Sequence, residues 1–316
     1  MVPGGGFPAM VYLHAITALL CPLERFSRQE SHSCQSTGNG RVTLIHSFLI
    51  AGAVSSVFMF LLWLVQLRTH NAGIVDCAWP FLTAATATWL ILASHAEPGA
   101  RQWLLIAFSI AWGVRLGTYL LKRVLRETED GRYRYLREYC GNYAPAAFFI
   151  FFQLQVLFVL LFATPIWAAS LNTSESLTWL DALGVLLWFL AMAGEWLSDN
   201  QLARFKSRVK DSSLVCDEGL WAYTRHPNYF FEWSHWWAYV LIGLGGELWW
   251  LCLGGPVLMY VFIIYLTGVP YTEQQSLRSK GTAYQAYQST TPMFFPALPI
   301  INRDASSSRT GGIQDV

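Results

Sequence analysis

Long apolar stretches alternate with short polar segments along most of the chain. The apolar stretches lie at residues 44–67, 74–94, 102–121, 148–169, 177–197, 227–245 and 248–266. Each is close to the ~20 residues that a helix needs to cross the hydrocarbon core of a bilayer. The pattern therefore predicts an all-α, polytopic membrane protein with about seven transmembrane helices.

The composition agrees with this prediction. Of the 316 residues, 54% are hydrophobic and 13% are charged, whereas a soluble domain carries about 25% charged residues. The six cysteines form no CxxC motif and the seven histidines show no ligand spacing, so neither a disulfide framework nor a metal site is predicted. The net charge of +1 gives no indication of a nucleic-acid partner. No GxGxxG motif or P-loop is present, so any nucleotide site must have another geometry.

The chain divides into three expected parts. Residues 1–43 form an N-terminal extension that we expect to be partly disordered, residues 44–300 form the membrane domain, and the Ser- and Gly-rich residues 301–316 form a disordered tail. With seven spans, 16 Lys and Arg residues fall on the side of the C-terminus and 4 on the other side. The positive-inside rule then places the C-terminus in the cytosol. In a eukaryotic cell, we expect the protein in the endoplasmic reticulum membrane.

A polar segment leads into the sixth apolar stretch. Pro227 suits the first position of a helix, where its missing N–H is not needed. Arg225 and His226 then lie just outside a helix start, whose free N–H groups suit a phosphate. Asn228 and Glu232 are four residues apart and share a helical face. Polar groups within a membrane usually serve a site, although an interfacial belt of Trp, Tyr, Arg and His is the alternative explanation.

Other ionisable residues lie at or within the apolar stretches. Arg115 interrupts the third stretch and needs a partner, for which Asp76 and Glu195 are candidates; the alternative is that it snorkels to the cytosolic edge. We expect Asp76 to pair with Arg115, although Asp76 could instead only interact with the dipole of its helix start. Glu195, Asp199 and Lys206 share a face at the end of the fifth stretch. This face is either the opposing wall of the same site or a solvated helix end.

Several motifs together resemble one known family, the steroid 5-alpha-reductase-like superfamily, and especially its uncharacterised membrane branch of steroid oxidoreductase-like proteins. The resemblance covers roughly residues 70–297. It depends on these residues as a set: Asp76 with Trp79, Trp112-Gly113 with Arg115-Leu116, Glu129-Asp130 with Arg132-Tyr133, Glu195 with Ser198-Asp199, Gly219-Leu220-Trp221, Arg225-His226-Pro227-Asn228-Tyr229 with Glu232, and the tail residues Gly268, Pro270, Glu273, Tyr284, Tyr287 and Pro296.

The resemblance implies a seven-helix membrane fold with an NADPH site between the C-terminal helices, open to the cytosol. By position, the cofactor-binding residues of the reductases correspond to Asp199, Lys206, Asn228 and Glu232. Lys206 and Arg225 can bind phosphate, and Asn228 and Glu232 can hold an amide or ribose hydroxyl groups. The full set that we expect around the cofactor is Glu195, Asp199, Lys206, Arg225, His226, Asn228, Tyr229, Glu232, Trp236 and Glu273.

The chain departs from the reductase pattern at the catalytic positions. The reductases have a tyrosine proton donor three residues before an arginine, and here Trp112 stands in that place before Arg115. Their catalytic glutamate has only Asp76 as a counterpart, and basic residues near their C-terminus are replaced around residues 272–275. An indole cannot act as the acid, so Asp76 or Tyr119 is the candidate proton donor.

Three functions are compatible with these residues. The first is NADPH-dependent reduction of a double bond in a lipid or steroid-like substrate. The second is S-adenosylmethionine-dependent methyl transfer, since isoprenylcysteine carboxyl methyltransferases share an Arg-His-Pro-x-Tyr element and a tail with Glu and paired Tyr. The Glu129–Tyr133 and Glu195–Asp199 elements favour the reductase over this alternative. The third is a lipid-binding membrane protein that has lost catalysis, which Trp112 would permit.

The distribution of basic residues predicts the orientation directly. We expect a tag placed after Val316 to be digested by protease added outside sealed microsomes, and a tag in the loop at residues 171–178 to be protected. Permeabilised microsomes, in which both tags are digested, provide the control. Protection of the C-terminal tag in sealed microsomes would show that the predicted orientation is wrong.

Overall fold

The structure is a computed structural model that describes residues 36–126, 128–174, 176–209, 211 and 213–298. The expectations for residues 1–35 and 301–316 lie outside the described residues. Two units are distinguished, the first ending at His46 and the second beginning at Ser47. In the first unit only the start of helix α2 is described, so the account below concerns the second.

Regular structure within the described residues is helical throughout, as predicted. The elements are α2 (Ser36–Thr69), α3 (Ile74–Ser94), α4 (Ala100–Arg126), α5 (Gly131–Cys140), η2 (Gly141–Tyr143), α6 (Ala144–Ser170), α7 (Trp179–Arg208), η3 (Gly219–Ala222), α8 (Pro227–Ser234), α9 (Trp236–Gly243), α10 (Trp249–Cys252), α11 (Gly254–Val261), the π-helical segment η4 (Phe262–Leu266), α12 (Val269–Lys280) and α13 (Thr282–Thr290).

Six helices of the described part are long and apolar enough to cross a membrane, which confirms a multi-pass membrane bundle. They comprise Leu44–Thr69, Ile74–Ser94, Ala100–Arg126, Gly131–Ser170, Trp179–Arg208 and Trp249–Lys280. The predicted stretch at residues 227–245 is not among the six, because it consists of the two eight-residue helices α8 and α9. Each is too short to cross the hydrocarbon core alone.

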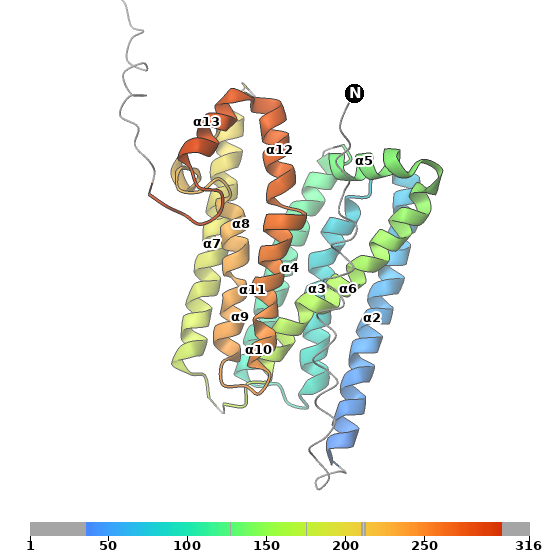
Figure 1. Ribbon diagram of the computed structural model, residues 1–316. Helices are drawn as coiled ribbons and strands as arrows, with labels where there is room; N and C mark the ends of the chain where they lie inside the picture. The colour runs from blue at the N-terminus through green and yellow to red at the C-terminus, as the bar shows by residue number, and fades with distance from the viewer. Residues whose placement is uncertain (1–35, 127, 175, 210, 212, 299–316) are drawn as a thin grey trace, which may run out of the picture. The chain divides into compact units, whose positions relative to one another are not determined.

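The helical path nevertheless continues from α8 into α9. His235 lies between them with helical backbone angles, φ −64° and ψ −25°. The Ala238 N–H bonds back to the His235 carbonyl at 3.0 Å, a tighter i→i−3 turn that interrupts the regular α-helical pattern. Both helices pack against α7, and Figure 1 shows them following one another beside it. The sixth predicted span is therefore formed by two consecutive short helices.

Helices α3 and α4 approach closely because α4 presents glycine to α3. A Cβ atom at Gly113 would lie 2.7 Å from the Ala84 Cβ and 2.8 Å from the Pro80 carbonyl oxygen. At Gly117, one turn further along α4, a Cβ would overlap the ring of Phe81. Small residues let membrane helices pack backbone to backbone, so this face of α4 is fixed against α3 and its opposite face is free to contact α7 and α8.

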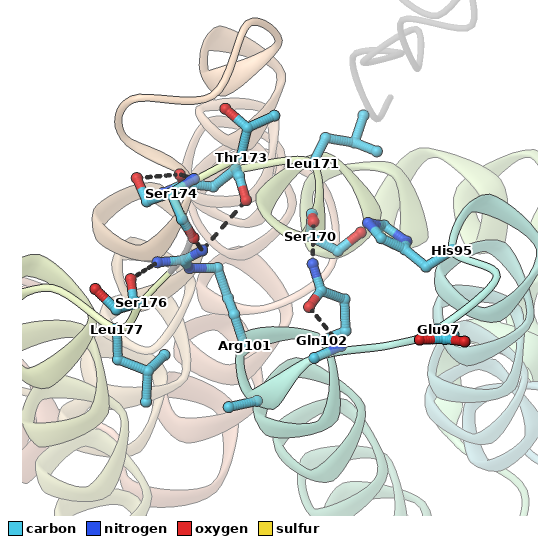
Figure 2. Close-up of a pocket in the computed structure, with 13 residues that line it drawn as sticks. His95, Glu97, Arg101, Gln102, Ser170, Leu171, Thr173, Ser174, Ser176 and Leu177 are labelled. Atoms are coloured by element: carbon cyan, nitrogen blue, oxygen red, sulfur yellow. Dashed lines mark hydrogen bonds between the residues drawn. The ribbon is translucent and has the colours of Figure 1, made fainter.

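A buried arginine closes the end of the bundle at which α4 and α7 begin. Arg101 forms a bidentate pair with Asp181 at 2.8 and 2.9 Å. Its remaining N–H groups donate to the carbonyl oxygens of Asn172, Ser174 and Ser176 at 3.2, 2.8 and 2.9 Å. Figure 2 shows the Arg101 guanidinium beside the loop that contains Ser174 and Ser176. All five donors of Arg101 are therefore used to hold the connection between α6 and α7.

This arginine also lines a cavity of about 540 Å³. Neighbouring polar groups of the cavity are paired as well, since Gln102 donates to the Ser170 carbonyl at 2.7 Å and accepts from the Gly99 N–H. The residues that line the cavity come mainly from the start of α4 and from the connection between α6 and α7, and these elements lie at the end of the bundle opposite the last turns of α7, where the predicted site begins. We therefore assign the Arg101 cluster to structure and not to ligand binding.

We expect either Arg101→Lys or Asp181→Asn to destabilise the protein strongly. Asp181 also accepts from Thr178 as part of a capping box that starts α7, so the pair and the helix start depend on each other. Removing one partner of a buried ion pair costs about 3–5 kcal/mol. Unfolding in mild detergent by added sodium dodecyl sulfate measures the loss, with Arg204→Lys on an exposed turn of α7 as the control. Losses that simply add in the double variant would contradict a shared interaction.

Candidate functional site

The predicted site begins where α8 starts. Pro227 occupies the first helical turn and His226 precedes it with non-helical angles, as the sequence predicts. The helix start offers fewer free donors than expected, however. The Asn228 side chain accepts from the Tyr229 N–H at 3.0 Å, and Pro227 has no N–H. A phosphate at this end would therefore depend more on side chains than on backbone N–H groups.

Residues from the two C-terminal helices cover this helix start. Glu273 of α12 lies 2.8 Å from the Arg225 guanidinium and 3.3 Å from the His226 imidazole. Gln288 of α13 donates to Glu273 at 2.9 Å and accepts from Arg225 through its backbone carbonyl at 3.0 Å. The structure thus brings Arg225, His226 and Glu273 together as predicted. It also shows that the charge of Arg225 is already neutralised by Glu273.

Tyrosines reinforce this cover. The Tyr229 hydroxyl pairs with that of Thr272 at 3.1 Å, and the Tyr229 ring stacks on His226. On α13, burial raises the pKa of Tyr284 to about 12, and the pKa of Tyr287 still further. Both phenols therefore remain neutral near pH 7, so they act here as hydrogen-bonding and packing groups.

Deeper in the bundle, α4, α7 and α8 bring together five ionisable or polar side chains. Asn228 donates to Asp199 at 3.3 Å. One turn further along α8, Glu232 accepts from the Trp112 indole at 3.0 and 3.2 Å. Glu195 lies in the same region and interacts electrostatically with Glu232. Both glutamates are less than 10% exposed, so the shared face of Asn228 and Glu232 does point into the bundle.

Arg115 forms an ion pair with Glu195. This confirms one of its two candidate partners, and the expected pair of Arg115 with Asp76 is wrong. Asp76 instead binds the guanidinium of Arg132 at 3.1 Å and the hydroxyl of Tyr133 at 2.6 Å. The reason is that α5 lies close to the start of α3 and supplies these two groups, while the Arg115 face of α4 turns towards α7.

The Asp76 cluster forms a second polar group at the membrane edge. Asp130 caps α5 and accepts three hydrogen bonds from Arg132. Burial alone would raise the pKa of Asp130, but the hydrogen bonds and charge of Arg132 outweigh it and hold that pKa below its usual value. The Arg132 guanidinium also lies 5.7 Å from the ring centre of Tyr271 in α12. The start of α12 thereby contacts the Asp76 cluster through Tyr271 and contacts Tyr229 through Thr272.

The remaining predicted residues lie around this centre. Tyr119 is about half exposed on α4, and its hydroxyl interacts electrostatically with Asp199. Trp236 is fully buried at the start of α9, with its ring centre 5.4 Å from that of Trp112. Lys206 lies on an exposed turn of α7. The structure therefore places Tyr119 and Trp236 next to the centre, and Lys206 at its outer edge.

Three further residues belong to this region and were not predicted as part of it. Trp112 holds Glu232, although the sequence suggested only that it had replaced an acid. Lys280 of α12 lies near enough to Lys206 for their charges to repel each other. His235 lies 4.0 Å from Glu232 and is three residues after it. That helical spacing on the face of Glu232 was the available signal for His235, whereas Lys280 had no local signal.

The part of the chain that matches a known protein family contains the whole candidate site. A family model described as "Protein of unknown function (DUF1295)" matches residues 62–291. The chain belongs to the DUF1295 family. An uncharacterised protein of Schizosaccharomyces pombe is 28% identical over 294 residues, which cover 82% of this chain and 84% of that protein. No solved structure matches. The DUF1295 region includes all the residues of the site, from Asp76 to Gln288.

The corrected ion pairs lead to a double-mutant prediction. We expect Arg115→Gln and Glu195→Gln each to destabilise the protein by about 3–5 kcal/mol, and the double variant to lose less than the sum, because the two charges neutralise each other in a buried place. Arg115→Gln combined with Asp76→Asn should be additive, since these residues have separate partners. The free energies of unfolding of the single and double variants in detergent complete both double-mutant cycles. Additivity in the first cycle, or coupling in the second, would contradict the observed pairing.

Proposed function

We propose that this DUF1295 protein is an integral membrane reductase that uses NADPH to reduce a double bond in a lipid or steroid-like substrate. The observation that carries the proposal is the convergence of Glu195, Asp199, Asn228 and Glu232 from two helices into one buried place. These residue types hold amide and hydroxyl groups. The resemblance to steroid 5-alpha-reductase-like proteins supports NADPH as the cofactor that these residues would hold.

The donor and acceptor groups of the site fit such a cofactor. Glu195 has a buried carboxylate oxygen that no protein N–H or hydroxyl reaches and that lies near the Glu232 carboxyl group, which suits a ribose hydroxyl or an amide N–H. Lys206 and Lys280 are near enough for their charges to repel each other, and no ion pair joins either of them to an acid among the described residues. Two lysines in one region without an acid partner suit a phosphate group. The proposed site thus runs from a basic outer edge to an uncharged ligand end near Glu232.

Within the proposed site, the residues of the chain divide the work. Lys206 and Lys280 would bind phosphate, and Asn228 and Glu232 would orient the reactive end. When bound, NADPH supplies a hydride. Of the two candidate proton donors, Tyr119 is about half exposed and its hydroxyl interacts with Asp199, whereas both carboxylate oxygens of Asp76 already accept hydrogen bonds. We therefore favour Tyr119 over Asp76 for contact with a substrate that enters from the bilayer.

Ligand-induced stabilisation in detergent tests the proposal. NADPH at 100 times its dissociation constant should stabilise the protein by about 2.7 kcal/mol, seen as a raised unfolding temperature, and S-adenosylmethionine should not. Stabilisation by S-adenosylmethionine alone would make methyl transfer the better assignment. Stabilisation by neither compound would favour a lipid-binding protein without this chemistry.

Substitutions at the two ends of the proposed site should change the binding of NADPH and NADH differently. Glu232→Gln and Asn228→Ala should weaken NADPH and NADH binding alike, by about tenfold to a hundredfold, since each removes a hydrogen bond to the shared part of the cofactor. Lys206→Ala and Lys280→Ala should weaken NADPH binding more than NADH binding, and more so at low salt. Lys122→Ala on an exposed turn of α4 is the control. Equal NADPH affinity in all five variants would refute this binding mode.

A further inference from the structure

An unusual group of buried polar side chains surrounds the junction of α8 and α9. His235, Trp236 and Tyr239 are each 0% exposed. The His235 ring centre lies 4.9 Å from that of Trp236, 6.0 Å from that of Tyr239 and 5.5 Å from that of Trp112. Four or fewer residues separate the first three, so they cluster within about one helical turn. The group therefore lies directly beyond Glu232, on the inner side of the site.

These side chains have few hydrogen-bond partners in the protein. The Trp236 indole N–H and the Tyr239 hydroxyl proton are buried without an acceptor, and the His235 ring approaches only the backbone of Glu232. Trp188 lies beside the Tyr239 hydroxyl but can only donate to it, so the Tyr239 proton still has no acceptor. Buried polar groups are normally satisfied, and an unsatisfied one calls for an explanation.

Several buried polar atoms without partners lie together here, although others of the described residues, such as those of Gln66 and Thr83, lie elsewhere in the bundle. Elsewhere the indoles find acceptors within the protein, as in Trp63 with the Pro145 carbonyl at 2.9 Å and Trp167 with the Ser94 hydroxyl at 2.8 Å. Among the buried indoles of the described residues, Trp236 and Trp79 have no partner, and Trp188 has only the Tyr239 hydroxyl. Trp79 packs edge-on against Trp112, and Trp188 lies beside Tyr239. All three therefore lie in contact with the group around His235.

The chemistry of the group specifies what it can bind. An indole only donates, a neutral imidazole donates once and accepts once, and a phenol donates through a rotatable proton and accepts through its oxygen. Because Trp188 already lies at the Tyr239 oxygen, the donors of the group exceed its free acceptors, and the missing partner is an acceptor oxygen. A carboxylate or phosphate ligand is disfavoured because Glu232 lies 4.0 Å from His235 and would repel it. What remains is an uncharged oxygen, as in a carbonyl group.

The backbone at this point is also suited to admitting a ligand. The regular α-helical ladder is interrupted at His235, where α8 ends and α9 begins with a tighter turn. Such interruptions within a helical segment often mark functional hinges. The interruption and the unpaired donors are independent observations at the same residue, and they are explained together if the site opens there.

We propose that His235 and Tyr239, with the Trp236 indole N–H, bind the carbonyl oxygen of an uncharged lipid inside the membrane. This inference rests on the proposed reductase function in one respect: it makes the substrate a ketone-bearing lipid, whose carbonyl is polarised by these donors. The Trp112 indole cannot serve in this way because it is engaged by Glu232. The binding site itself does not require NADPH, and so can be tested separately.

The test compares two probes on the purified full-length protein in detergent. A long-chain alkyl methyl ketone should raise the unfolding temperature, and the alkane of the same carbon number should not. Tyr239→Phe and His235→Leu should each weaken binding of the ketone by about twofold to tenfold, the effect of losing one uncharged hydrogen bond. Tyr260→Phe on α11 is the matched control, and His235→Gln, which keeps a donor, should restore part of the loss.

A spectroscopic measurement covers variants that fail to fold. With a carbon-13-labelled carbonyl, binding to the wild-type protein should lower the carbonyl stretching frequency relative to the ketone in empty detergent micelles. An unshifted carbonyl, equal stabilisation by ketone and alkane, or wild-type ketone affinity in Tyr239→Phe and His235→Leu would each overturn the proposal. If the wild-type protein binds the ketone but does not bind NADPH, the reductase function is refuted and the carbonyl-binding site still stands.

Discussion

The interior of this bundle depends on how two buried glutamates are accommodated. An ionisable group among membrane-spanning helices is costly unless it has a partner. Helix α4 supplies both partners, the Arg115 guanidinium for Glu195 and the Trp112 indole for Glu232. Its glycine face meanwhile packs against α3. A single helix thus joins the α3 side of the bundle to α7 and α8, and the polar centre exists only because these contacts hold it.

The sequence was most informative where the physical cause is local. Apolar length predicted the spans, Pro227 predicted the start of α8, and the four-residue spacing of Asn228 and Glu232 predicted their common inward face. One local feature was not predicted, namely the interruption of the helix at His235 between α8 and α9. Nothing in the apolar run at residues 227–245 marks an interruption, because a tighter turn uses residue types that an unbroken helix would also accept. The expected single span was therefore found as two short helices.

Partners that are distant in sequence were not predictable in the same way. Arg132 lies 56 positions from Asp76 and Glu273 lies 47 positions from His226, so no helical spacing connects them. For Arg115, the sequence offered Asp76 and Glu195, and we expected Asp76; only the packing of α4 against α7 shows that the partner is Glu195. In this protein, the amphipathic faces could be predicted from the sequence, but the choice of which faces meet required the three-dimensional arrangement.

Trp112 shows how a substitution that removes one chemical property can leave a position important for another. An indole cannot transfer a proton at this position, but it donates a hydrogen bond that holds Glu232. Its ring also forms one wall of the group around His235 and Trp236. Donors that the position no longer provides are present one layer further in, unpaired and buried. On this argument, His235, Trp236 and Tyr239 together take over the polarisation of a carbonyl oxygen that Trp112 cannot provide, and the loss of any one of them would weaken the site without removing its other donors.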